Sequence, residues 1–284
     1  METSPQISIV IPAYNREKII GRTLDCIASQ TFTEWECIVV DDFSADNTRQ
    51  LIEEYEKKDG RFHYMLNERK KGAQGARNTG INHAMSEWIW LMDSDDLVHN
   101  DFLEKMYGAT NENVDVVTCF LNVIDKDSNE LKRKYDRVCD VNVHDDLLSW
   151  KCYVYSNNCI IRKRKLLEIG GLDENCPAHQ EYDTHICLSS VSRYATVCEV
   201  LLDYYVGGKD TISQNYERSM EGWMYLLSKH KKKWLDNIDA GSKMYSKVWG
   251  NVTWSYTSRW KKLCAYMKLF VISPRLYFLS RKKV

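Results

Sequence analysis

The sequence predicts an α/β fold in which a mostly parallel sheet is flanked by helices and followed by a helical C-terminal region. Over the first hundred residues, short apolar runs alternate with amphipathic stretches, a pattern typical of strand–helix–strand crossover units. The apolar runs are continuous, which indicates strands that are covered on both faces of a sheet. From about residue 214 onward the pattern is helical and rich in Trp and Tyr.

The elements follow one another in a regular order. Ile20, Leu24 and Ile27 lie on one face of the first predicted helix, and Asp46 or Asn47 is suited to cap the second. Strands are predicted over 7–12, 36–42, 62–66 and 88–92, with intervening helices that include 20–28, 45–58 and 75–85. Further strands are predicted over 114–124, 156–163 and 194–206, with a short helix and the turn 170–174 between the last two.

Composition limits the class of protein. The chain has 284 residues, 44% hydrophobic and 28% charged, as is ordinary for a globular domain. Its net charge of −1 gives no indication of nucleic-acid binding. The 10 cysteines form no CxxC pair, which argues against a zinc knuckle or a thioredoxin-like motif. With no signal peptide and no apolar run near the ~18 residues that span a bilayer, we expect a reduced, cytoplasmic protein.

Polar residues follow three of the first four strands. The first strand runs into Tyr14, the second ends at Asp42, and the fourth runs into Asp93, Asp95 and Asp96. Ligands of open parallel sheets bind beyond the carboxyl ends of the strands. We therefore expect these side chains to converge on one cleft.

The three clustered carboxylates indicate a metal site. A single Asp after a strand is more often a turn or helix-cap residue, but like charges repel, and one cap is sufficient. Hard carboxylate oxygens suit Mg²⁺ or Mn²⁺. A calcium EF-hand is excluded, because its sixth position requires Gly and counting from Asp93 reaches Val98. Such a metal would carry a diphosphate, as Mg²⁺ does at nucleotides.

No standard phosphate-binding loop follows the first strand. Neither GxxxxGK[ST] nor GxGxxG is present there. The basic, glycine-containing stretch 70–80 is either a flexible loop or part of the cleft. If the stretch lies beside the metal-binding carboxylates, Arg77 is a candidate to bind a phosphate group or to line the cleft.

Taken together, the motifs resemble those of the family 2 glycosyltransferases, which have the GT-A fold and are inverting enzymes common in bacterial cell-surface polysaccharide synthesis. The matching stretches cover roughly residues 6 to 210 in the family's order; they are 7–48, 72–81 ("GAQGARNTGI"), 91–96 ("LMDSDD"), 170–174 ("GGLDE") and 180–188 ("QEYDTHICL"). The resemblance implies a GT-A catalytic domain over 1–210, with a nucleotide-binding half (1–98) and an acceptor half (99–210). Residues 211–284 would form the helical C-terminal region.

The resemblance also implies roles for individual residues. Pro12 and Tyr14 would line the nucleobase pocket, and Asp42 would accept a hydrogen bond from uracil N3–H. Asp93-Ser94-Asp95 corresponds to the DxD motif. Asp93, Asp95 and Arg77 would bind the nucleotide sugar, and Asp95 and Asp96 the Mg²⁺ or Mn²⁺ ion, although the division of labour among the three carboxylates is left open.

The catalytic base implied by the resemblance is Glu181. Family members usually carry Glu-Asp where this chain has Gln180-Glu181, so the carboxylate here is one methylene longer. Taken alone, Glu181 or Asp183 would more often be a solvated acid in the first turn of a helix. A histidine that relatives often carry near Gly207 is absent, which leaves Lys209 as its substitute.

The predicted activity is inverting transfer of a sugar from a nucleotide-diphosphate sugar, with UDP the favoured nucleotide, to a saccharide or lipid-linked saccharide. Two alternatives are a sugar nucleotidyltransferase and a nucleotide-sugar-binding module without catalysis. The sugar, the acceptor, the linkage and the oligomeric state have no signature in the sequence.

The C-terminal tail, residues 259–284, carries eight Lys or Arg residues and no acid, which leaves −9 for the rest of the chain. Trp260, Leu263, Met267 and Phe270 recur at helical spacing. Such a helix either packs on its own domain or lies in a membrane interface with its cations on anionic headgroups. The second interpretation predicts peripheral membrane contact through 259–284, at the inner face of the membrane.

Overall fold

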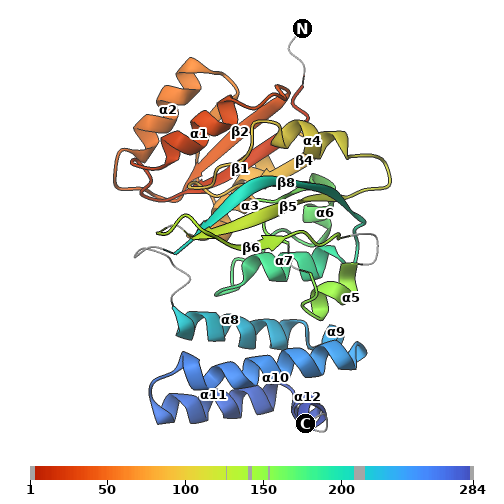
Figure 1. Cartoon of the computed structure of the whole chain (residues 1–284). Helices are drawn as coiled ribbons and strands as arrows, with labels where there is room; N and C mark the ends of the chain where they lie inside the picture. The colour runs from red at the N-terminus through yellow and green to blue at the C-terminus, as the bar shows by residue number, and fades with distance from the viewer. Residues whose placement is uncertain (1–3, 126, 140–142, 153, 208–214, 282–284) are drawn as a thin grey trace. The chain divides into compact units, whose positions relative to one another are not determined.

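The computed structural model describes residues 4–125, 127–139, 143–152, 154–207 and 215–281 (Figure 1). The chain forms two compact units. The first unit comprises Met1–Val141, Val154–Glu174 and Val191–Gly208, and the second comprises Asn142–Tyr153, Asn175–Ser190 and Lys209–Val284. The units therefore interleave along the chain, and the domain limits expected at residues 98 and 210 remain predictions about function.

The first unit is built on a sheet whose strand order is β3-β2-β1-β4-β7-β5-β6, with β8 paired to β5. Its first half is parallel: β1 (Ile7–Ala13) lies between β2 (Trp35–Asp41) and β4 (Trp88–Leu91), and β3 (Phe62–Leu66) pairs with β2. These strands occupy the positions that their apolar runs predicted. Their carboxyl ends consequently lie at one edge of the sheet.

Helices cover both faces of this parallel half (Figure 1). Ile9 and Ile11 of β1 belong to the apolar cluster that contains residues of α1 (Ile20–Ala28) and α2 (Thr48–Lys58). Val10 points to the opposite face, since side chains alternate along a strand. There it contacts α3 (Ala73–His83) so closely that a Cβ on Gly80 would lie 2.4 Å from a Val10 methyl carbon.

The second half of the sheet is mixed. The short strand β7 (Cys159–Arg162) is antiparallel to both β4 and β5 (Val116–Asp125), β6 (Leu131–Tyr135) is antiparallel to β5, and β8 (Tyr194–Val206) is parallel to β5. The remaining helices of this unit are α4 (Phe102–Gly108) and α6 (Lys163–Glu168). The predicted α/β class with a mostly parallel sheet is confirmed, and β6 was missed because its exposed "LKRKY" carries no apolar signal.

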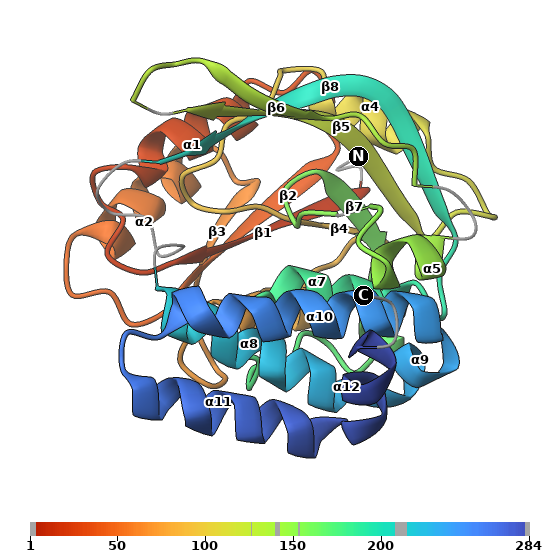
Figure 2. The same cartoon turned by 60° about the horizontal axis from the view of Figure 1, so that its bottom comes forward.

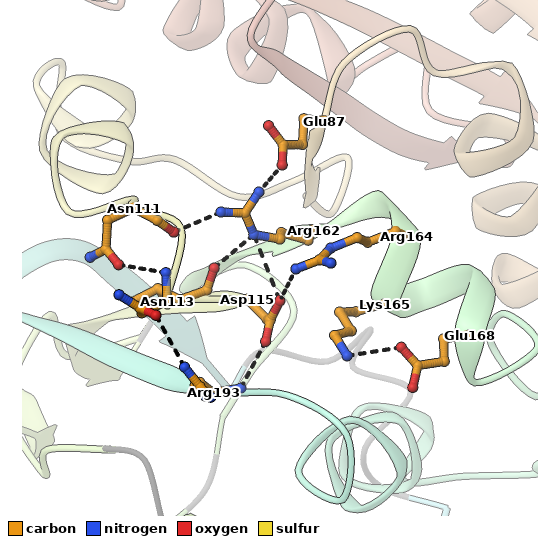
Figure 3. Close-up of polar contacts among 10 residues, drawn as sticks. Glu87, Asn111, Asn113, Asp115, Arg162, Arg164, Lys165, Glu168 and Arg193 are labelled. Carbon is orange, nitrogen blue, oxygen red and sulfur yellow. Dashed lines mark hydrogen bonds and ion pairs between the residues drawn. The ribbon is translucent and has the colours of Figure 1, made fainter.

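A network of ion pairs and hydrogen bonds lies at the amino ends of β4, β5 and β8 (Figure 3). Arg162 is 7% exposed; its guanidinium pairs with Glu87, donates to the Val114 carbonyl oxygen at 2.7 Å, and lies 4.6 Å from the Trp88 ring centroid. Asp115 accepts hydrogen bonds from the Arg164 side chain and the Arg193 backbone N–H at 2.9 and 3.1 Å. These ion pairs and hydrogen bonds connect the segments that precede β4, β5 and β8, and they stabilise this end of the sheet.

The second unit is helical, as predicted for the C-terminal region. Its helices are α5 (Val143–Leu148), α7 (Gln180–Leu188), α8 (Tyr216–Lys229), α9 (Lys231–Asp236), α10 (Ile238–Ser255), α11 (Arg259–Ile272) and α12 (Pro274–Arg281). Figure 2 shows α8, α10 and α11 side by side. Tyr182, Trp234, Tyr245 and Leu269 belong to its core. Within the described ranges, none of the helices has the length and hydropathy to cross a bilayer.

Candidate active site

The site is assembled at the carboxyl edge of β1, β2 and β4. Pro12 lies within β1, and Tyr14 follows it with 48% of its surface exposed. The Lys71 ammonium lies 4.8 Å from the centroid of the Tyr14 ring, which is within cation–π range. An exposed aromatic face beside a cation is suited to stacking against a planar, negatively charged ligand.

Asp42 is buried at the end of β2 and holds the following loop in place. It is 6% exposed, and it accepts hydrogen bonds from the Asn67 amide at 2.7 Å and from the Gly72 backbone N–H at 2.8 Å. A carboxylate has about four acceptor positions, so these two bonds leave capacity for another donor. The neighbouring Asp41 accepts from the Ser44 N–H and the Tyr64 hydroxyl group; burial, followed by the Asp41 charge, raises the pKa of Tyr64.

The glycine-containing stretch 70–80 forms the end of the loop before α3 and the first turns of that helix. A Cβ at Gly75 would lie 1.8 Å from the Lys70 carbonyl oxygen, so only glycine permits this close approach. Arg77, on the first turns of α3, is 7% exposed. It donates to the Gln74 side-chain oxygen at 2.8 Å and pairs with Asp93. Its Nε is buried and has no hydrogen-bond partner among the described residues.

The "GGLDE" turn docks on the same helix. Asn78 of α3 accepts from the Leu172 N–H at 2.8 Å and donates to the Leu172 carbonyl oxygen at 2.9 Å and to Glu174 at 2.8 Å. Gly171 has φ +82°, and a Cβ there would lie 2.9 Å from the Asn78 side-chain oxygen. Burial tends to raise the pKa of Glu174, but hydrogen bonds from Arg69 and Asn78 outweigh it, and the pKa is lowered.

The three clustered carboxylates have different surroundings. Asp93 pairs with Arg77, and Asp96 accepts a hydrogen bond from the Asn157 amide at 2.7 Å. Asp95 is exposed and makes no hydrogen bond or ion pair within the part of the chain that the structure describes. Asp95 is therefore the carboxylate most available to a cation, and its hard oxygens fit Mg²⁺ or Mn²⁺.

Residues outside the predicted set hold this acidic loop. Arg16 donates from Nε to the Ser94 hydroxyl oxygen at 3.1 Å, and Thr23 donates to the carbonyl oxygens of Ser94 and Asp96 at 3.0 and 3.2 Å. Asn157 lies here because β7 is antiparallel to β4, so the amino end of β7 lies at the carboxyl edge of β4. Its side-chain oxygen is buried and has no hydrogen-bond partner in the described structure.

In the second unit, α7 carries the other two candidate acids. Glu181 is half-buried in the first turn of the helix, where the helix dipole favours a carboxylate. Asp183 is 2% exposed, and its two oxygens accept from Lys229 Nζ and His230 Nε2, each at 2.7 Å. Atoms of Asp183, Cys187 and His230 able to ligate a metal lie within 4.8 Å of one another, but the Lys229 ammonium already neutralises Asp183.

Comparison with known sequences decides the family. The family model "Glycosyl transferase family 2" matches residues 8–170. The chain belongs to glycosyl transferase family 2. It is therefore a glycosyltransferase, as the motifs predicted.

Relatives of the family 2 chain agree with this assignment. An uncharacterized glycosyltransferase of Methanocaldococcus jannaschii is 27% identical over 246 residues, covering 82% of this chain and 83% of that protein. The UDP-Glc:alpha-D-GlcNAc-diphosphoundecaprenol beta-1,3-glucosyltransferase WfgD of Escherichia coli is 42% identical over 91 residues. That match covers 32% of this chain and 35% of the relative.

Solved structures similar to this family 2 chain confirm the GT-A fold. TarS 1-349 of S. aureus in complex with UDP-GlcNAc has a TM-score of 0.64 at 16% identity, covering 98% of this chain and 92% of the other. The mannosyltransferase PcManGT of Pyrobaculum calidifontis, in complex with GDP-Man and Mn2+, has a TM-score of 0.63 at 16% identity, covering 98% and 84%.

The family 2 match covers only part of the predicted site. Pro12, Tyr14, Asp42, Arg77 and the acidic loop fall within residues 8–170, whereas Glu181 follows them. In the first unit, the structure joins Arg77 to Asp93 and Asp42 to the loop before α3. Lys209 lies outside the described residues.

Proposed function

We propose that the chain is an inverting glycosyltransferase that uses a UDP-sugar donor and a lipid-linked saccharide acceptor. The observation that carries the proposal is the gathering of an exposed aromatic ring, a buried Asp and an acidic loop at the carboxyl edge of three parallel strands. UDP is supported by the names of the E. coli relative and the S. aureus complex, and a lipid-linked acceptor by the E. coli relative.

The donor would bind along this edge. Pro12 and Tyr14 would contact the nucleobase, and Asp42 would accept from its N3–H. Arg77, which has an unused buried N–H, and Asp93 would bind the ribose and diphosphate side of the donor. Asp95, with Asp96 beside it, would hold Mg²⁺ or Mn²⁺, which when bound supplies positive charge to a leaving diphosphate. The Mn2+ in the PcManGT complex supports the use of a divalent metal.

Glu181 would act as the general base. The acceptor hydroxyl oxygen forms a bond to the anomeric carbon as the bond to the diphosphate breaks; UDP leaves, and the hydroxyl proton passes to Glu181. Attack from the face opposite the leaving group inverts the anomeric centre, and no covalent enzyme intermediate is formed. Asp183 is less suited to this role, because it is 2% exposed and its charge is already balanced by the Lys229 ammonium.

Reaction with a lipid-linked acceptor would occur at the inner face of a membrane. The chain would then be a cytoplasmic enzyme that binds the membrane peripherally. The tail 259–284 is the segment whose composition suits that contact, since it carries eight cations and no acid.

The proposal is tested with a panel of UDP-sugars and GDP-mannose, each incubated with the full chain, Mn²⁺ and a GlcNAc-diphosphate-lipid. We expect UDP release and a lengthened lipid-linked saccharide with one UDP-sugar. Pyrophosphate release from UTP and a sugar 1-phosphate would instead identify a nucleotidyltransferase. UDP-sugar binding without turnover of any panel member would identify a binding module.

A further inference from the structure

The apolar stripe of α11 faces solvent rather than the protein. We define the outward stripe as Trp260, Leu263, Met267, Phe270 and Val271, whose exposed fractions are 72, 50, 63, 40 and 74%. The core of the second unit is contacted instead by Ala265 and Leu269, which are 3 and 0% exposed. The helix therefore packs on its own unit through Ala265 and Leu269, as one of the two interpretations predicted, while the residues of the outward stripe remain largely exposed.

The apolar surface continues from α11 onto the neighbouring helices. Phe278 of α12 is 58% exposed, and its ring centroid lies 6.2 Å from that of Phe270. An apolar groove of about 260 Å³ lies along this surface, lined by Trp249, Tyr266, Met267, Phe270, Val271 and Tyr277. It is smaller than the roughly 300–1,000 Å³ of sites for drug-sized ligands, but it suits a short length of hydrocarbon chain.

Cations flank this apolar surface. No ion pair involves Arg259, Lys262, Lys268 or Arg275 within the described ranges. Lys261 pairs with Glu217 at 2.8 Å. The helices α11 and α12 contain no acidic residue, so every charged side chain that these two helices carry is a cation.

We propose that the outward stripe, with Phe278 and the groove, is a docking surface for an anionic phospholipid bilayer. This deepens the proposed function by naming the surface that reaches the membrane. Tryptophan and apolar side chains would enter the interface while the flanking cations contact anionic headgroups. A second copy of the chain is disfavoured as occupant, because a two-fold contact would set these cations against themselves.

The first measurement is flotation of the full chain with vesicles, without donor or acceptor. We expect binding to phosphatidylcholine vesicles that contain phosphatidylglycerol, weak binding to phosphatidylcholine alone, and release by salt. Because no sugar transfer is required, failure here would leave the proposed transferase activity untouched. Equal binding to both vesicle types would contradict the proposal.

Variants separate the apolar and charged contributions. The double variant Met267→Glu/Val271→Glu should bind anionic vesicles at least tenfold more weakly, as expected when inserted apolar groups become charged. The control is Met85→Glu, at a residue of the first unit that is 68% exposed, and it should leave vesicle binding unchanged. Lys268→Gln/Arg275→Gln should weaken it by about 25-fold, since each cation near an anionic surface contributes about fivefold. The matched control is Lys18→Gln/Lys57→Gln, at exposed positions of the first unit.

Deletion of 259–284 is unsuitable as a test, because Ala265, Leu269 and Leu276 belong to the core of the second unit. A second readout needs only one conservative change. The emission spectrum of Trp260 is obtained by subtracting the spectrum of the Trp260→Phe variant from that of the full chain. Its maximum should shift to shorter wavelength when anionic vesicles are added. An unshifted difference spectrum would overturn the proposal. So would a dimer that the Met267→Glu/Val271→Glu variant dissociates, since it would identify the surface as a contact between copies.

Discussion

Two carboxylates in the first turn of α7 differ in how deeply they are buried. Asp183 is buried between Lys229 and His230, whereas Glu181 is half-buried. We predict that Glu181→Gln lowers kcat by ~10²–10⁴-fold with little change in UDP affinity or stability. Asp183→Asn should instead lower the free energy of unfolding by about 3 kcal/mol or more, because it uncouples a buried ion pair.

Steady-state kinetics and urea unfolding on both variants distinguish these outcomes. A stable Asp183→Asn protein with lost turnover, beside an active Glu181→Gln protein, would show that the base is Asp183.

Asp95 is the carboxylate of the acidic loop with no partner in the described structure. We predict that chelation abolishes transfer, that Mn²⁺ or Mg²⁺ restores it, and that Asp95→Asn lowers the rate at least ~10²-fold. Asn157→Ala, which removes the hydrogen bond to Asp96, is expected to have a smaller effect. Full activity in excess chelator would remove the metal from the mechanism.

Asp42 combines a predicted nucleobase contact with an observed structural one. Asp42→Ala should weaken UDP binding by ~1.5–3 kcal/mol through the lost nucleobase bond, and it also releases Gly72 and Asn67. Asn67→Ala is the matched control, because it frees the loop while leaving the carboxylate. Calorimetry that gives the two variants equal UDP affinity would assign the effect to the loop alone.

At the scale of the element, the close packing of α3 on β1 depends on Gly80. We predict that Gly80→Ala lowers the free energy of unfolding by about 1–3 kcal/mol, because its Cβ would overlap a Val10 methyl group. Val10→Ala should reduce that penalty in the double variant. Gly250→Ala in α10, where nothing lies within 4 Å, should stabilise by about 0.5–1 kcal/mol. Urea unfolding of the four variants measures the coupling.

The sequence predicted the parallel half of the sheet well, because each of its strands is a largely apolar run and informative polar residues follow three of the four. It did not predict that Asn157 would meet Asp96. That contact depends on β7 running antiparallel to β4, and strand direction has no local signal in a run such as "CIIR". Arg16 and Thr23 were missed for a related reason: their partners are the hydroxyl and carbonyl oxygens of a loop about 70 residues away.

At the scale of the whole molecule, buried histidines make stability depend on pH. Burial lowers the pKa of His185 to about 3 and that of His179 to about 4. An unfolded histidine takes up a proton below about pH 6.5, but the folded ones do not. The free energy of unfolding should therefore fall as the pH drops below about 6.5, by up to roughly 1.4 kcal/mol per unit for each histidine.

Urea unfolding at pH 7, 6 and 5 measures this slope. His185→Leu should flatten it between pH 6 and 5, whereas His83→Gln, at a side chain that is 43% exposed, should leave it unchanged. An identical slope in all three proteins would assign the acid sensitivity to other groups.

The interleaving of the two units has a consequence for synthesis on the ribosome. The chain passes between the units five times, and α5 and α7 emerge long before the helices that complete their core. At roughly 5–20 residues per second, Leu148, Tyr182 and Ile186 remain without their later partners for several seconds or longer. During that interval the nascent chain presents an apolar surface to chaperones, and a premature stop before α8 would make that exposure permanent.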